Sequence, residues 1–250
     1  MNWFQDLNEK IEKHELSTFD AFVFVMQKIK WDENLIYISK KIRFIQANLG
    51  LLRLSLFPDL DWNTLAPNEK IIFINNRLFQ EKKIVDLLNA NPLMMGLMIQ
   101  TIANINGIKL TFCLLGSVLT LKLVDKSSNY FFHLEKKGEL ISSQKILDLI
   151  FEGKQIVQLS FKELVIYYYL EQESYLLETL TNEELLKMYN IMNLIKEHDP
   201  QLIIKRVTYM KILGKNDEAL SALKSYLNFL PQSHFTGPLA KLYKQLSNSF

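Results

Sequence analysis

The sequence predicts an α+β protein that is mostly helical, with a small antiparallel sheet in the middle and helical hairpins at the end. The 250 residues include only 8 Gly and 6 Pro against 16 Phe and 10 Tyr, which favours long regular elements. Apolar residues recur every three or four positions in both halves of the chain, and this period changes to two between residues 109 and 135. With 48% apolar residues the chain can build a sizeable core.

The first predicted elements are amphipathic helices. Residues 17–30 (STFDAFVFVMQKIK) place apolar side chains at spacings of three and four behind a Ser/Thr cap, and residues 34–54 continue the pattern. We expect these two segments to form an N-terminal helical bundle. Two further helices are predicted over residues 67–82 and 92–105.

The middle of the chain has the alternating pattern of strands. Three short strands joined by tight turns are predicted at residues 109–115, 117–124 and 129–135. Apolar side chains occur on both sides of the first strand, which predicts a sheet covered on both faces. On that strand Leu110, Phe112 and Leu114 would face one way, and Cys113 and Leu115 the other.

From about residue 143 the helical period returns, and we expect it to continue to the end of the chain. Two helix starts fit the capping box, in which side chains satisfy the free backbone amides of the first turn. They are Ser160 with Glu163 and Thr181 with Glu184. The helix after the second box has one apolar stripe, which predicts a helical hairpin and consists of Leu185, Met188, Tyr189, Met192 and Ile195.

The sequence argues against a membrane span and against export. Residues 87–108 carry no charge, but four Asn and one Gln among them would be costly to bury in lipid, so we expect a buried helix of a soluble protein. The start MNWFQDLNEK lacks the basic flank and apolar run of a secretory signal. The single cysteine cannot form an internal disulfide, which agrees with a cytoplasmic location.

No metal or cofactor site is predicted. The segment FPDLDW, residues 57–62, has two aspartates without a third ligand and is interpreted as a turn. His14, His198 and His234 lack the spacing of a zinc site. The sequence has no phosphate-binding loop, dinucleotide fingerprint or nucleophile elbow, so we expect no cofactor.

The net charge of +2 is too small to indicate a nucleic-acid partner, but it is unevenly distributed. Residues 151–200 hold 4 Lys and Arg against 9 Asp and Glu, a net −5. Residues 201–250 hold 7 against 2, a net +5. Two interpretations remain open: helical layers of opposite charge that pack on one another, or a basic C-terminal face for an acidic partner.

The segment LGKNDEALSALKSYLNFLP has the residue types of a repeat hairpin at four positions. Gly214 permits a left-handed turn, and Ala219 permits close helix packing. The segment resembles a tetratricopeptide repeat, and the resemblance implies that Tyr226 lies on the inner face and that Pro231 ends the second helix. A degenerate second copy precedes it, and residues 236–248 resemble a capping helix.

The order of the elements extends this resemblance. A helical lead-in, a PDLD element, a helix followed by three strands, and then repeat hairpins is similar to the bacterial SirB-type proteins, which join a transglutaminase-like domain to tetratricopeptide repeats. The resemblance covers residues 35–245. It implies a helical and transglutaminase-like domain over residues 1–155 and a tetratricopeptide-like helical domain over residues 156–250.

The resemblance also implies where a catalytic triad would lie. Transglutaminase-like folds place a cysteine at the start of a helix packed on the sheet, a histidine on a following strand and an aspartate on the next. Aligned without gaps from Pro92, these positions fall on Gly96, Val118 and His133. Because glycine cannot attack and valine cannot accept a proton, the sequence resembles a family member that has lost its chemistry, a pseudoenzyme.

Cys113 with His133 is the remaining candidate for chemistry. A reactive thiolate needs an accessible site and a neighbouring base, whereas Cys113 is predicted in mid-strand among apolar residues. We therefore expect a non-catalytic cytoplasmic scaffold or regulatory protein that binds a protein partner through the repeat surface, the cleft of the lost site, or both. The alternatives are a divergent thiol-dependent peptidase or acyl transferase using this pair, and a structural subunit of a larger assembly.

Overall fold

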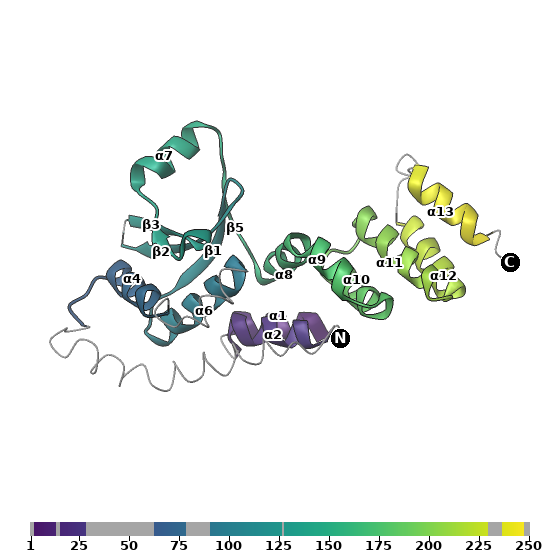
Figure 1. The fold of residues 1–250 in the computed structure, drawn as a ribbon, viewed down its shortest axis with the longest axis horizontal. Helices are drawn as coiled ribbons and strands as arrows, with labels where there is room; N and C mark the ends of the chain where they lie inside the picture. The colour runs from purple at the N-terminus through teal and green to yellow at the C-terminus, as the bar shows by residue number, and fades with distance from the viewer. Residues whose placement is uncertain are drawn as a thin grey trace. The chain divides into compact units, whose positions relative to one another are not determined.

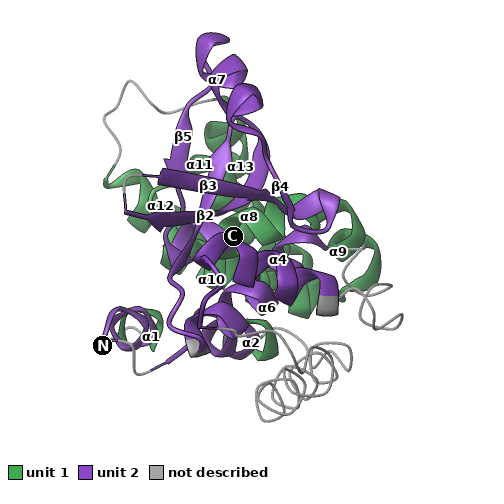
Figure 2. Cartoon of the chain, turned by 90° about the vertical axis from the view of Figure 1, so that its left-hand side faces the viewer, with its two compact units in different colours: residues 1–6, 25–31, 165–250 green, residues 7–24, 32–164 purple. Residues whose placement is uncertain are grey.

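The computed structural model describes residues 3–13, 16–28, 63–78, 91–126, 128–229 and 237–247. Within these residues the protein is mostly helical and has one antiparallel sheet of five strands (Figure 1). The chain divides into two compact units, residues 7–24 with 32–164, and residues 1–6 with 25–31 and 165–250 (Figure 2). The helix predicted at 34–54 and the turn predicted at 57–62 lie outside the described residues.

The helices before the sheet follow the predicted apolar periodicity. They are α1 (Trp3–Glu12), α2 (Thr18–Gln27), α4 (Pro67–Leu78) and α6 (Pro92–Ile105). The bounds of α6 are those predicted, because Asn91 accepts a hydrogen bond from the Met94 amide at 3.2 Å and Pro92 occupies the first turn. Helix α1 lies outside the helical segments predicted from the sequence.

The sheet has the strand order β4-β3-β2-β1-β5. Its strands are β1 (Leu110–Leu115), β2 (Val118–Asp125), β3 (Ser128–His133), β4 (Glu139–Leu140) and β5 (Ile156–Gln158). The three predicted strands are confirmed. The expectation that the helical period continues unbroken from residue 143 is wrong, because β5 pairs with β1. This short exposed strand follows the predicted domain boundary at 155/156 yet belongs to the sheet.

One face of the sheet packs on α6. Phe112, Leu121 and Phe132 lie in register across β1, β2 and β3 and are buried. Gly96 on α6 approaches this row closely enough that a Cβ atom would stand 2.5 Å from the ring of Phe112. Helix α4 packs on α6, and Asn75 Nδ2 donates a 2.8 Å hydrogen bond to the backbone oxygen of Gly138 beside β4.

The opposite face of the sheet is covered by α7 (Ser143–Phe151). Figure 1 shows α7 on one side of the strands, with α4 and α6 on the other. Ile146 and Leu149 of α7 pack against a small buried cluster, which consists of Cys113, Leu115, Phe131 and Ile141. The sheet is therefore covered on both faces, as predicted from the apolar pattern of β1.

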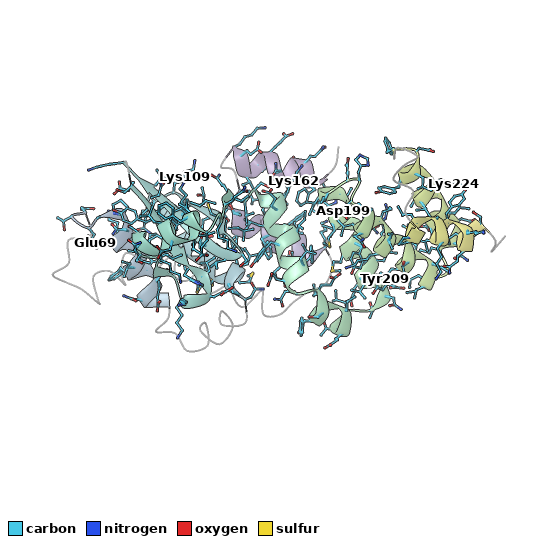
Figure 3. All side chains as sticks on the ribbon, turned by 90° about the horizontal axis from the view of Figure 1, so that it is seen from above. Glu69, Lys109, Lys162, Asp199, Tyr209 and Lys224 are labelled. Carbon is cyan, nitrogen blue, oxygen red and sulfur yellow. The ribbon has the colours of Figure 1, made fainter. Side chains whose placement is uncertain are left out.

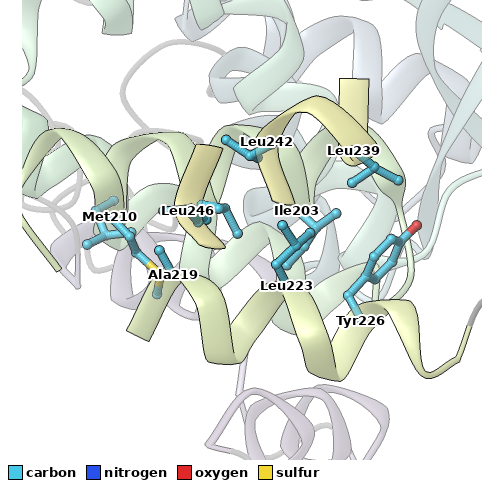
Figure 4. Close-up of a cluster of buried hydrophobic side chains, with 10 residues drawn as sticks. Ile203, Met210, Ala219, Leu223, Tyr226, Leu239, Leu242 and Leu246 are labelled. Carbon is cyan, nitrogen blue, oxygen red and sulfur yellow. The ribbon is translucent and has the colours of Figure 1, made fainter. Parts of the chain in front are cut away.

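Six helices follow β5 in the described residues, and the last four of them share a core. They are α8 (Phe161–Glu171), α9 (Glu173–Thr179), α10 (Asn182–Ile195), α11 (Pro200–Ile212), α12 (Asn216–Leu227) and α13 (Gly237–Ser247). Helix α10 packs on α11, α11 on α12, and α12 on α13. Their shared cluster, shown in Figure 4, contains Leu186, Ile203, Val207, Met210, Ala219, Leu223, Tyr226, Leu239, Leu242 and Leu246.

The predicted capping boxes are present. At the start of α10, Thr181 Oγ1 accepts from the Glu184 amide at 3.3 Å, and the Glu184 carboxylate accepts from the Thr181 amide at 2.8 Å. Ser160 and Glu163 make the same reciprocal contacts before α8. Asp199 caps α11 by accepting from the amides of the next turn. These caps account for the accuracy of the predicted helix starts.

Candidate functional site

Cys113, Thr120 and His133 form one row across three neighbouring strands. Cys113 on β1 pairs with Thr120 on β2, and Thr120 pairs with His133 on β3. Directly paired residues of an antiparallel sheet have their side chains on the same face. Thr120 therefore lies between the thiol and the imidazole, and two strand spacings, about 9–10 Å, separate the backbones of Cys113 and His133.

Burial decides the ionisation of both end groups. Cys113 is 1% exposed. Burial raises the pKa of its thiol, an effect that the hydrogen bond with Thr111 and the charge of Lys122 only partly offset. Burial also lowers the pKa of His133, and its Nδ1 has no hydrogen-bond partner among the described residues. At neutral pH the row therefore holds a neutral thiol and a neutral imidazole.

The structure does not gather the three positions that the ungapped alignment assigned to a triad. Gly96 lies on α6 and approaches Phe112 and Leu134. Val118 and His133 belong to the face of the sheet opposite α6. Val118 pairs with Leu115, and His133 lies in the row of Cys113 and Thr120; these residues alternate with the ones that face α6. A nucleophile at position 96 would thus be separated by the sheet from side chains at positions 118 and 133.

No group of three or more His, Cys, Asp or Glu side chains suited to a metal ion occurs in the described part of the chain. His14 and His234 lie outside that part. His198 occupies the turn between α10 and α11 with a φ of 70°, and its ring packs on Phe229 at a centroid distance of 5.0 Å.

Three of the four predicted repeat positions lie within the described residues, and they belong to one hairpin. Gly214 adopts a φ of +74° in the turn between α11 and α12. Ala219 is fully buried where α12 packs on α11. Tyr226 is also buried, and its hydroxyl donates to the backbone oxygen of His198 at 3.2 Å. Pro231 lies outside the described residues.

A polar cluster that was not among the predicted sites joins α9, α10 and α11. Glu173 forms an ion pair with Lys205 and accepts a 3.0 Å hydrogen bond from the Tyr189 hydroxyl. The Tyr189 ring stacks on Tyr209 at 5.4 Å, and the Lys205 ammonium lies 5.7 Å from the centre of the Tyr189 ring. Tyr209 lies on α11 and is labelled in Figure 3. The cluster brings an acidic residue of the 151–200 segment onto a basic residue of the 201–250 segment.

Charge and burial oppose each other in this cluster. Burial raises the pKa of Glu173, but the hydrogen bonds from Lys205 and Tyr189 outweigh it, and the net pKa is lowered. Burial, reinforced by the Glu173 carboxylate, raises the pKa of Tyr189. Glu173 is therefore held as a carboxylate and Tyr189 as a neutral donor. The only local sequence signal for this cluster is the four-residue spacing of Lys205 and Tyr209, since Glu173 is 32 residues from Lys205.

No family model, curated protein or solved structure matches the chain. Among the described helices, none has the length and apolar character needed to cross a membrane.

Proposed function

We propose that the protein is a non-catalytic, cytoplasmic interaction scaffold whose C-terminal helices bind an acidic segment of a protein partner. One observation carries this proposal: three exposed lysines lie on α11 and α13, two helices whose sequences contain no Asp or Glu. The row of Cys113, Thr120 and His133 supports the non-catalytic part, because its thiol is buried and Thr120 separates it from the imidazole.

The three lysines are brought together by the packing of the helices. Lys211 Nζ on α11 donates to Gln245 Oε1 on α13 at 3.2 Å. Lys241 precedes Gln245 by four residues and Lys244 by three, so these side chains are neighbours on the α13 surface. We call Lys211, Lys241 and Lys244 the lysine face. In contrast with Lys205, which is paired with Glu173, these lysines have no carboxylate partner among the described residues.

The leucines of α13 are directed inward, and its exposed side is polar. Leu239, Leu242 and Leu246 are buried in the shared core of the hairpins, whereas Lys241, Lys244 and Gln245 are exposed. A polar outer face is what a terminal helix of a repeat array requires. The lysine face is therefore suited to a charged partner rather than to continued apolar stacking.

We further propose that the fold is that of a degenerate SirB-type protein. The packing of α6 on an antiparallel sheet supports a transglutaminase-like first domain, and the hairpin of α11 and α12 with Gly214 at its turn supports a tetratricopeptide-like second domain. Gly96 and His133 lie on opposite faces of the sheet, so they cannot both occupy positions of one active site. On this proposal, the family pattern fits the segment after Pro92 only if the alignment contains a gap.

Binding of an acidic peptide tests the scaffold proposal. The probe is a fluorescein-labelled peptide of alternating Glu and Leu, and fluorescence anisotropy measures its affinity for the whole chain. Changing Lys211, Lys241 and Lys244 together to Gln should weaken binding about tenfold, since exposed charge contacts contribute about 0.5 kcal/mol each. Raising the salt concentration to about 1 M should have a similar effect on the wild type.

The matched control changes three exposed lysines elsewhere among the C-terminal helices, one on α10, one at the start of α12 and one within α12. Lys187, Lys215 and Lys224, the last labelled in Figure 3, are each replaced by Gln, and the affinity should stay within about twofold of the wild type. Equal losses in the two triple variants would show that total charge, not the lysine face, attracts the peptide. An undetectable interaction of the wild type with the peptide would reject the proposal.

A further inference from the structure

Strand β5 is an open edge of the sheet. In the order β4-β3-β2-β1-β5 it pairs with β1 on one side, and among the described residues no strand pairs with its other side. Its three residues are all exposed, and Ile156 and Val157 are 39% and 42% exposed. An edge strand presents unpaired backbone N–H and C=O groups, so β5 is a template on which another strand can pair.

The pairing with β1 decides which backbone groups of β5 point outward. The Leu159 amide donates to the backbone oxygen of Phe112 at 2.8 Å, so Leu159 directs its backbone groups toward β1. This direction alternates along an antiparallel strand, so Val157 also faces β1, whereas Ile156 and Gln158 face away from it. The open edge therefore offers two N–H donors and two C=O acceptors.

The two edges of the sheet differ in how they are protected. Proteins block unwanted pairing at an edge with charged residues, prolines or bulges. Strand β4, at the other edge, contains Glu139 and follows the charged residues Lys136 and Lys137. Strand β5 contains neither a charge nor a proline. Of the two edges, β5 is the one suited to the addition of a strand.

We propose that β5 pairs with β5 of a second copy of this chain, antiparallel and with a two-fold axis at Val157. Ile156 exchanges both of its outward hydrogen bonds with Gln158 of the second copy, and symmetry repeats the exchange. Val157 then faces Val157 of the second copy, which makes an apolar β-branched pair. This register satisfies all four outward backbone groups and uses every residue of both strands.

Charges on either side of β5 favour a second copy over an unrelated strand. Antiparallel pairing brings the chain before β5 of one copy beside the chain after β5 of the other. Glu152 lies five residues before Val157, and Lys162, labelled in Figure 3, lies five residues after it. Neither forms an ion pair with the described residues. Because the interface is symmetric, Glu152 of each copy faces Lys162 of the other, and the favourable contact occurs twice.

Sedimentation equilibrium of the full chain tests self-association between about 10 µM and 1 mM, the range suited to a small and weak interface. The average mass should rise from that of one chain toward that of two. The triple change of the lysine face to Gln should leave this rise intact, because no residue of that face belongs to the β5 edge. A chain that stays monomeric would overturn the proposal and would leave the edge to an extended segment of a different protein.

A charge on the two-fold axis separates β5 from other surfaces. Val157→Lys places two like charges opposite each other and should weaken self-association at least about tenfold. Val124→Lys is the matched control, because Val124 is 60% exposed near the end of β2 and lies away from β5 in the strand order. It should leave self-association unchanged, and circular dichroism checks that both variants fold. Equal effects of the two substitutions would reject β5 as the contact.

A disulfide locates the axis. Facing residues of a non-hydrogen-bonded antiparallel pair have Cα atoms about 4.5 Å apart, within the range that a disulfide spans. Val157→Cys should therefore form a covalent dimer under mild oxidation. Val124→Cys contains the same buried Cys113 and should remain a single chain. If the wild type self-associates but Val157→Cys does not cross-link, the two copies meet elsewhere and the proposed register is wrong.

Charge reversal tests whether the partner is a second copy. Glu152→Lys alone and Lys162→Glu alone should each weaken self-association about fivefold, since each removes two exposed charge contacts. The double variant should recover most of the wild-type affinity, because the reversed charges again face each other across the axis. A double variant weaker than either single variant would show that these charges do not meet, contrary to the proposed pairing.

Discussion

Gly96 lies against Phe112 so closely that a Cβ atom at position 96 would stand 2.5 Å from Cε1 of the ring. The same atom would be 2.7 Å from Leu134 Cδ1. Glycine in the middle of a helix costs about 0.5–1 kcal/mol relative to alanine, so its presence in α6 needs a physical reason. The close packing of α6 on the sheet provides one, independent of any lost nucleophile.

Replacement of Gly96 by Ala should therefore destabilise the protein despite its better helix propensity. The overpacking cost is about 1–3 kcal/mol and the propensity gain about 1 kcal/mol, so we expect a net loss of up to about 2 kcal/mol. Urea unfolding followed by circular dichroism measures this. Gly237→Ala is the control and should be neutral, because no atom of the described residues beyond its own helix lies within 4 Å of the added Cβ. A Gly96→Ala variant as stable as the wild type would contradict the packing account.

The thiol of Cys113 should react slowly with iodoacetamide in the folded protein. Its 1% exposure limits access of the reagent to the sulfur. Its raised pKa lowers the fraction of thiolate, the form that attacks the reagent. We expect a rate at least about tenfold below that of the urea-unfolded chain at pH 7, where an ordinary thiol is a few per cent thiolate. His133→Ala should leave the folded-state rate low. A folded-state rate above the unfolded rate, abolished by His133→Ala, would instead establish the thiol-enzyme alternative.

His133 should make the stability of the protein depend on pH. Burial lowers the pKa of its imidazole below 6.5 in the folded state. The charges of Lys136 and Lys145 lower this pKa further, and those of Glu135 and Glu139 partly oppose the shift. The unfolded chain then binds the proton more readily, so the stability from neutral His133 is complete above pH 6.5 and is lost as the pH falls toward the folded-state pKa.

Replacement of His133 by Gln removes this titration. The slope of the unfolding free energy against pH should become shallower between about pH 5 and pH 6.5, the interval between carboxylate and ordinary histidine titration. Above pH 6.5 the profiles of the two proteins should run parallel. Urea unfolding at a series of pH values provides the measurement, and an unchanged slope in the variant would show that another group titrates.

The Glu173–Lys205 ion pair should couple α9 to α11. A double-mutant cycle with Glu173→Gln and Lys205→Met should give an interaction free energy of about 1 kcal/mol, because the pair is partly buried and Glu173 also accepts from Tyr189. Glu9 and Lys13 form the matched exposed pair, 3.6 Å apart with side chains 50% and 63% exposed, and should give less than about 0.5 kcal/mol. Equal coupling in the two pairs would contradict the role assigned to burial.

Local patterns predicted the elements that local physics stabilises. Three predictions were correct because each feature depends on residues within one helical turn. They are the capping boxes at Ser160 and Thr181 and the start of α6 at Pro92. Strand β5 was missed because its three exposed residues have no alternating burial, and its position depends on pairing with β1 far along the chain. Glu173 and Lys205 were missed for the same reason, since their contact depends on how helices pack.

The sequence by itself determined that the protein is mostly helical, that a sheet with two covered faces interrupts the helices, and that one hairpin turns at Gly214. Apolar period, capping residues and the left-handed preference of glycine are properties of neighbouring residues, so they are readable without a fold. Tertiary structure alone decided that Thr120 separates Cys113 from His133, and that Gly96 and His133 lie on opposite faces of the sheet. Strand register sets both relationships, because a shift of one residue would move each side chain to the other face.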